Sequence, residues 1–178
     1  MTPRLVVPGL ALLVGCGPAA TPPPAAPTAP KAVTIAAGDH DTTLAAVGNH
    51  LAGLGWKVSP DKAQHRVIVI SPKGTKFGLG VHMGVQGDLN HVFMFKAFMP
   101  KGDAKGSPQV AALVAKLANN VNGVVYQVSD DQAVVCATWV YFLDTLDPKL
   151  VLRTLELLDQ VAVVVMATQA PDLVKLLE

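Results

Sequence analysis

The fold of this protein is decided by two stretches, KFGLGVHM at residues 76–83 and NHVFMFKAFM at residues 90–99. Apolar residues alternate with small or polar ones in the first stretch, and the second is rich in aromatic residues. Successive side chains of a strand point to opposite faces, so both stretches predict strands. Residues 84–89 between them predict a turn, and the whole segment therefore predicts an antiparallel hairpin.

A turn centred on residues 86–87 determines which residues of this hairpin pair. It places Gly78 opposite Phe95 and Gly80 opposite Phe93, so that two large rings lie across backbone that carries no side chain. The other face of the hairpin then carries the apolar residues Leu79, Val81, Val92 and Met94.

The hairpin is therefore apolar on both of its faces. Either helices cover both faces, or one face is a surface for a partner. In the second case four aromatic residues form an exposed patch on the sheet: Phe93, Phe95, Tyr126 and Trp139. In the first case the chain termini or the last helix bury these rings, as most aromatic side chains are buried.

The rest of the chain from residue 33 onward supplies helices and further strands. Helical spacing of apolar residues predicts one helix from an N-cap at Asp41 or Thr42 to Leu54, and others after Ser107–Pro108 and Asp147–Pro148. β-branched runs predict strands at 66–70, 124–128 and 133–140, and 161–166 is compatible with a strand or with the last helix. Ser59–Pro60–Asp61 predicts a turn. The order α-β-β-β-α-β-β-α predicts an α+β fold with one mostly antiparallel sheet.

This element order, the sequence LANNVN at residues 117–122 and the hairpin after it resemble the YbjN-domain family over about residues 41–167. The family is described as regulators of bacterial sensory transduction, with a poorly defined molecular activity. Its fold is similar to that of type III secretion chaperones, which use sheet surfaces to bind partners and to dimerise. The resemblance therefore implies a fold and a binding surface, and it implies no catalytic residue.

The N-terminal segment predicts export. Arg4 precedes an apolar run at residues 5–14, which is too short to span a bilayer and has the length of a signal-peptide core. The run ends in Leu13, Val14, Gly15 and Cys16, which resemble the lipobox of bacterial lipoproteins. The resemblance implies that residues 1–15 are removed as a signal peptide and that Cys16 carries the lipid, palmitate among its acyl chains. The alternative is an ordinary signal peptide with an unmodified cysteine.

Residues 16–32 then form the lipidated cysteine and its tether, and residues 33–178 form the folded domain. Six of the fifteen residues 17–31 are Pro and five are Ala. Proline fixes φ and removes a hydrogen-bond donor, so this segment predicts an extended spacer of about 45 Å. Gly17 stands where Asp commonly signals inner-membrane retention, so we expect an outer-membrane lipoprotein facing the periplasm. Cys136 then lacks a disulfide partner, and the fold depends on its apolar core.

Composition and motifs argue against several classes of function. Lys plus Arg number 14 and Asp plus Glu 13, so the basic excess typical of nucleic-acid-binding proteins is missing. The sequence contains no P-loop, dinucleotide-binding glycine motif, nucleophile elbow, CxxC or HExxH. We therefore expect no nucleic-acid partner, no cofactor and no enzymatic activity.

Two histidines offer the remaining chemistry. The hairpin register places His82 opposite His91, within reach of one metal ion or one shared proton. Two imidazoles are fewer than the three protein ligands of a catalytic zinc site, and two solvated histidines at a strand end are the alternative. His40, His50 and His65 show no ligand spacing.

The sequence therefore predicts a membrane-tethered, non-catalytic periplasmic lipoprotein that binds a protein or peptide, as a chaperone- or regulator-like module. A homodimer through the sheet is one form that such binding can take. The alternative prediction is a metal-binding or pH-sensing envelope protein that uses His82 and His91.

Overall fold

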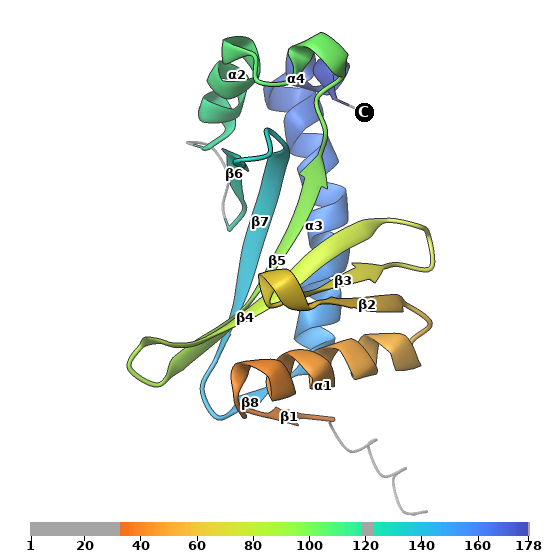
Figure 1. Cartoon of the computed structure of the whole chain (residues 1–178), viewed down its shortest axis with the longest axis vertical. Helices are drawn as coiled ribbons and strands as arrows, with labels where there is room; N and C mark the ends of the chain where they lie inside the picture. The colour runs from red at the N-terminus through yellow and green to blue at the C-terminus, as the bar shows by residue number, and fades with distance from the viewer. Residues whose placement is uncertain (1–32, 119–122, 178) are drawn as a thin grey trace, which may run out of the picture. The chain divides into compact units, whose positions relative to one another are not determined.

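The computed structural model describes residues 33–118 and 123–177, and they form the predicted α+β fold (Figure 1). The main sheet has six strands in the order β2-β3-β4-β5-β7-β6, and every neighbouring pair is antiparallel. Its strands are β2 (Lys57–Asp61), β3 (Arg66–Ile70), β4 (Lys76–Gln86), β5 (Leu89–Phe98), β6 (Val125–Val128) and β7 (Val134–Phe142). Two short strands that the sequence did not predict, β1 (Ile35–Ala36) and β8 (Thr145–Leu146), pair with each other.

Side chains cap the first turns of the three longest helices, α1 (His40–Gly53), α2 (Pro108–Ala118) and α3 (Pro148–Gln169). A further helix is α4 (Pro171–Leu176), and η1 (Lys62–Gln64) and η2 (Gly102–Ala104) are short 3-10 helices. The predicted caps Ser107 and Asp147 are confirmed, since each side chain accepts a hydrogen bond from the first turn of its helix. The predicted cap of α1 is wrong, because Asp39 accepts from the Thr42 amide at 2.7 Å and the helix therefore starts earlier.

The last long helix continues through the segment that was also compatible with a strand. Residues 161–166 belong to α3, and both Ala162 and Met166 are buried. They continue the helical spacing set by Val151, Leu155 and Leu158. Packing of this apolar stripe outweighs the β propensity of the valines between them, which is a weak and context-dependent preference.

The segment predicted as a turn at residues 59–61 is part of β2 instead. Pro60 pairs with Val67, and β2 is an edge strand of the main sheet. Proline cannot donate a backbone hydrogen bond, but an edge strand has one side without a neighbouring strand and can hold it there. The position of β2 at the edge therefore explains why the proline does not end the strand.

The β4–β5 hairpin has the predicted register over most of its length. The confirmed pairs are Gly78–Phe95, Leu79–Met94, Gly80–Phe93, Val81–Val92 and His82–His91. The predicted position of the turn is wrong, because β4 extends to Gln86, which pairs with Leu89 after a register shift. Gly84 lies in the shifted stretch with a φ of 64°, and its N–H donates to Asn90 Oδ1 at 2.9 Å. A left-handed glycine and a side-chain acceptor together accommodate the irregularity.

All four helices contribute to one apolar core on a single face of the main sheet. In Figure 1, α3 runs along the sheet beside β5 and β7, and α1 lies across β4 and its neighbours. The largest fully buried side chains come from both layers: Leu51, Phe77, Leu79, Met94, Leu117, Leu155, Leu158 and Leu173. This arrangement leaves the opposite face of the main sheet with a smaller apolar cluster that contains no residue of the described helices.

Candidate functional site

No helix among residues 33–118 and 123–177 contributes to the apolar cluster on the other face of the main sheet. On that face, Phe95 and Trp139 pack on Ala133, Val135 and Ala137. Six ring-bearing residues of β4, β5 and β7 define what we call the open face: His82, His91, Phe93, Phe95, Trp139 and Tyr141. Three of the four predicted patch residues therefore lie on this surface.

The rings of the open face lie on glycine backbone, as the sequence predicted. A Cβ atom on Gly78 would overlap the ring of Phe95, and one on Gly80 would lie 2.8 Å from Phe93 Cδ1. Both rings are half-buried although no described helix covers them. Glycine at these two positions is thus required for the rings to lie flat on β4, where they present a continuous apolar surface.

Aromatic and imidazole rings form a row across the open face. Successive ring centroids are 5.3 Å (Phe95–Phe93), 5.7 Å (Phe93–His82), 4.9 Å (His82–His91) and 5.5 Å (His91–Tyr141) apart. Trp139 pairs with Phe93 across β5 and β7 and widens the row. The Phe95–Phe93 pair lies at a separation at which aromatic rings stabilise each other by about 0.5–1.5 kcal/mol beyond their area of burial.

A groove of about 410 Å³ lies beside Phe95 at one end of the row. Its lining includes Met99 and Val135, together with the charged side chains of Arg66, Lys76 and Asp131. The Arg66 guanidinium carbon lies 5.4 Å from the centroid of the Phe95 ring. Apolar rings surrounded by charged groups of both signs are the usual composition of a protein-binding surface.

His91 is the buried polar group of the open face. The residue is 8% exposed, and its Nδ1 atom is buried without a hydrogen-bond partner in the part of the chain that the structure describes. Burial lowers the pKa of His91 because it disfavours the charged imidazole, and a positive charge on His82 lowers it further. The folded protein therefore favours neutral His91.

This lowered pKa predicts that the protein loses stability as the pH falls from about 7 to about 5. The unfolded chain takes up a proton on His91 more readily than the folded one, so the contribution is complete above the ordinary value of 6.5 and decreases below it. Urea unfolding at both pH values measures the loss. We expect His91→Gln to reduce the difference, and an unchanged difference in this variant would contradict the prediction.

The structure corrects the position of the fourth predicted patch residue, Tyr126. This side chain is 2% exposed and belongs to the core on the helix-covered face, where its hydroxyl donates to the Ala162 carbonyl at 3.4 Å. Tyr126 pairs with Cys136, which is also buried in that core. Burial raises the pKa of the Cys136 thiol to about 12, so the sulfur stays protonated and is a poor nucleophile.

His82 and His91 are neighbours, but their geometry does not favour one shared metal ion. Their rings are stacked with an interplanar angle of 16°. Nitrogen lone pairs lie in the ring plane, so those of two stacked imidazoles run side by side and do not converge on one point. No group of three or more metal-ligating side chains among the described residues includes this pair.

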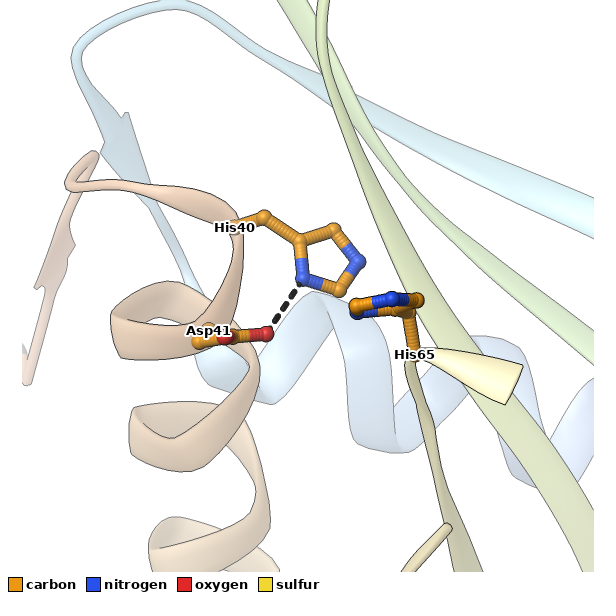
Figure 2. A group of neighbouring side chains, drawn as sticks. All are labelled: His40, Asp41 and His65. Atoms are coloured by element: carbon orange, nitrogen blue, oxygen red, sulfur yellow. Dashed lines mark hydrogen bonds and ion pairs between the residues drawn. The ribbon is translucent and has the colours of Figure 1, made fainter. Parts of the chain in front are cut away.

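A different cluster of metal-ligating residues escaped the sequence analysis. His40, Asp41 and His65 lie together where α1 begins and where η1 leads into β3 (Figure 2). No local pattern in the sequence indicates this cluster, because 23 or more intervening residues separate His65 from the other two and only packing of α1 beside β3 brings them together.

The predicted lipobox residues Leu13, Val14 and Gly15, the predicted lipidation site Cys16 and the predicted tether lie outside the described residues. Within residues 33–118 and 123–177, every helix, α3 included, lacks the combination of length and apolar character that crossing a membrane requires. Anchoring through Cys16 therefore stays a prediction from the sequence.

Comparison with known proteins adds one similarity of fold. No protein-family model and no curated protein matches the sequence. Among solved structures, the chain is similar to the crystal structure of YbjN, described as "a putative transcription regulator from E. coli". The TM-score is 0.47 and the identity is 11%, over 76% of this chain and 95% of that one.

Proposed function

We propose that this protein is a membrane-tethered, non-catalytic periplasmic lipoprotein whose open face binds a protein or peptide. The observation that carries the proposal is the placement of Phe93 and Phe95, whose half-buried rings lie on Gly78 and Gly80, away from the helix-covered core. Rigid aromatic side chains lose little conformational entropy on binding and provide large contact areas, so they dominate the energetics of protein interfaces.

The chemistry of the open face favours a protein partner over a nucleic acid. Arg66 and Lys76 line the groove beside Phe95, but Asp131 lines it too. A nucleic-acid surface requires a predominance of basic groups, and this chain has 14 basic and 13 acidic residues. Apolar side chains of a protein or peptide fit the rings of the aromatic row.

The tether supports a location at the cell envelope. Leu13, Val14, Gly15 and Cys16 follow an apolar run in the order of a lipoprotein processing site, and the proline-rich residues 17–31 separate Cys16 from the domain. Each buried CH₂ group of an acyl chain contributes about 0.8 kcal/mol, so several chains on one cysteine hold a protein at a membrane durably. The spacer then allows the domain to meet partners away from the bilayer surface.

Site-specific photocrosslinking in intact cells tests the binding function. A photoreactive residue replaces Tyr141 on the open face, and the matched control replaces Leu157 on α3; the two side chains are 57% and 56% exposed. We expect a discrete protein adduct from position 141 and none from position 157, identified by mass spectrometry. An adduct with a second copy of this chain would identify the partner as a homodimer. Equal labelling from both positions, or none from position 141, would contradict the proposal.

Replacing the predicted lipidation site gives a further prediction: Cys16→Ser abolishes palmitate labelling and moves the protein out of the membrane fraction. The hydroxyl of serine cannot form the thioether that carries the lipid. Metabolic labelling with radioactive palmitate and cell fractionation measure the change. Cys136→Ala is the matched control and keeps both the label and the membrane location. Persistent labelling of Cys16→Ser would show that the lipid is attached elsewhere.

A further inference from the structure

Three side chains able to bind a metal ion converge at the start of α1. Figure 2 shows His40 and Asp41 on the first turn of the helix and His65 facing them from the segment before β3. One ligand atom from each residue lies within 4.8 Å of the other two, and His40 Nδ1 is 2.8 Å from Asp41 Oδ1. The two imidazole planes meet at 82°, unlike the stacked pair of the open face.

We propose that His40, Asp41 and His65 form a binding site for a divalent transition-metal ion, with Zn²⁺ the best match. Two imidazole nitrogens and one carboxylate oxygen are a ligand set that Zn²⁺ accepts, whereas Ca²⁺ and Mg²⁺ prefer oxygen ligands throughout. Three protein ligands leave one position of a tetrahedral ion for water or a further ligand. The site is separate from the open face and does not depend on the function proposed for it.

The spacing of the three residues requires only a small closure around the ion. Ligand atoms of a tetrahedral Zn²⁺ site are about 3.4 Å apart at bond lengths of about 2.1 Å, so no separation within the 4.8 Å limit must shrink by more than about 1.4 Å. Asp41 and His65 are exposed, and His40 is partly exposed. Their side chains can therefore turn toward a common ion without displacing core residues.

The electrostatic surroundings accommodate a cation at this helix end. The positive end of the α1 dipole opposes a cation, but this effect is weak at an exposed helix end. Two carboxylates counter it: Asp39, which accepts from the Thr42 amide, and Asp41 itself. Asp61 and Arg66 are paired at 2.9 Å and offset each other, while Lys62 lines the adjoining groove and adds one positive charge.

An ion bound at this cluster would lie beside a groove and would link two segments of the chain. Asp41 and His65 both line a groove of about 570 Å³ between α1 and the β2–β3 connection. Water or an anionic ligand can therefore occupy the remaining position of the ion from the groove. The ion would also join α1 to the segment before β3, and binding to the folded state alone would raise the melting temperature.

Titration of the full chain, purified without a polyhistidine tag, with Zn²⁺ tests the proposal. Isothermal calorimetry should give one ion per chain, and thermal unfolding at an ion concentration of about 100 times Kd should shift upward by about 5–10 °C. His65→Gly is the informative variant, because His65 has φ 46° and ψ 48°, and glycine adopts this left-handed conformation without strain. It should weaken binding at least about tenfold, as Asp41→Asn should, because the loss of a direct ligand exceeds the effect of a supporting residue.

Two matched histidine variants test whether Zn²⁺ binds at His40, Asp41 and His65 or at another histidine. His50→Gln replaces a residue of the same helix outside the cluster, and His82→Gln replaces a residue of the open face. Both should bind Zn²⁺ like the unmodified chain. The proposal is overturned if Zn²⁺ does not bind saturably, if His65→Gly binds with unchanged affinity and melting shift, or if His82→Gln abolishes binding.

Discussion

A variant carrying Phe93→Thr and Phe95→Thr keeps its fold and loses its partner. Both rings are half-buried on the open face and lie on Gly78 and Gly80, outside the helix-covered core. Threonine retains a high strand propensity and places no second cation beside Arg66, which contacts the Phe95 ring. Loss of aromatic anchors typically costs at least about 2 kcal/mol in binding, which corresponds to about a 30-fold weaker complex.

The measurement is the yield of the Tyr141 crosslink in intact cells, together with the urea midpoint of the purified chain. Leu150→Gln with Leu157→Gln is the matched control, since it removes two exposed apolar side chains from α3. The control should keep the crosslink at its original yield. If the threonine variant retains the crosslink, the rings are not the anchors; if it unfolds, they belong to the stabilising core.

Tyr126→Ala has the opposite effect and lowers stability by about 3–5 kcal/mol, the range for replacing a core aromatic residue by alanine. The Tyr126 ring is 2% exposed and packs in the core that includes Cys136 and residues of α3. The loss is a large fraction of the roughly 5–15 kcal/mol by which a domain is stable against unfolding. A measurable fraction of the molecules should therefore be unfolded at physiological temperature.

Urea unfolding of the full chain measures the loss, and Tyr126→Phe separates its causes. Phenylalanine keeps the ring and removes only the long hydrogen bond from the hydroxyl to the Ala162 carbonyl, 3.4 Å in length, so we expect a loss of about 1 kcal/mol or less. If Tyr126→Ala keeps full stability but loses the Tyr141 crosslink, Tyr126 acts at the binding surface, as its sequence position first suggested.

Tyr126 shows why the sequence assigned three patch residues to the right face and one to the wrong face. A β6–β7 loop centred between Asp130 and Asp131 would pair Tyr126 with Val135, on the open face. The observed partner is Cys136, one residue further along, on the core face. Gln132 adopts a positive φ of 66° in this loop, a conformation that its residue type does not favour. A shift of one residue moves every side chain of a strand to the other face.

The β4–β5 hairpin was predictable because residues close together in the sequence determine its pairing. Alternation along residues 76–83 and a short connection determine which side chains pair, and Gly78 and Gly80 mark where rings fit on the backbone. The irregularity at Gly84 depends on the side chain of Asn90, which also donates to the Leu143 carbonyl. The two hydrogen bonds of Asn90 connect β4 and β5 with the residue that follows β7. The sequence of the hairpin alone therefore did not indicate the irregularity.

The sequence by itself determined the three longest helices except for their exact ends, most of the strands and the pairing within the central hairpin, because periodicity and short turns act over a few residues. Only the tertiary structure decided which face of the sheet stays open and which face holds Tyr126. It also brought His65 to the start of α1. These features depend on the packing of segments far apart in the chain, and a one-residue change in pairing or a different helix position would reverse them.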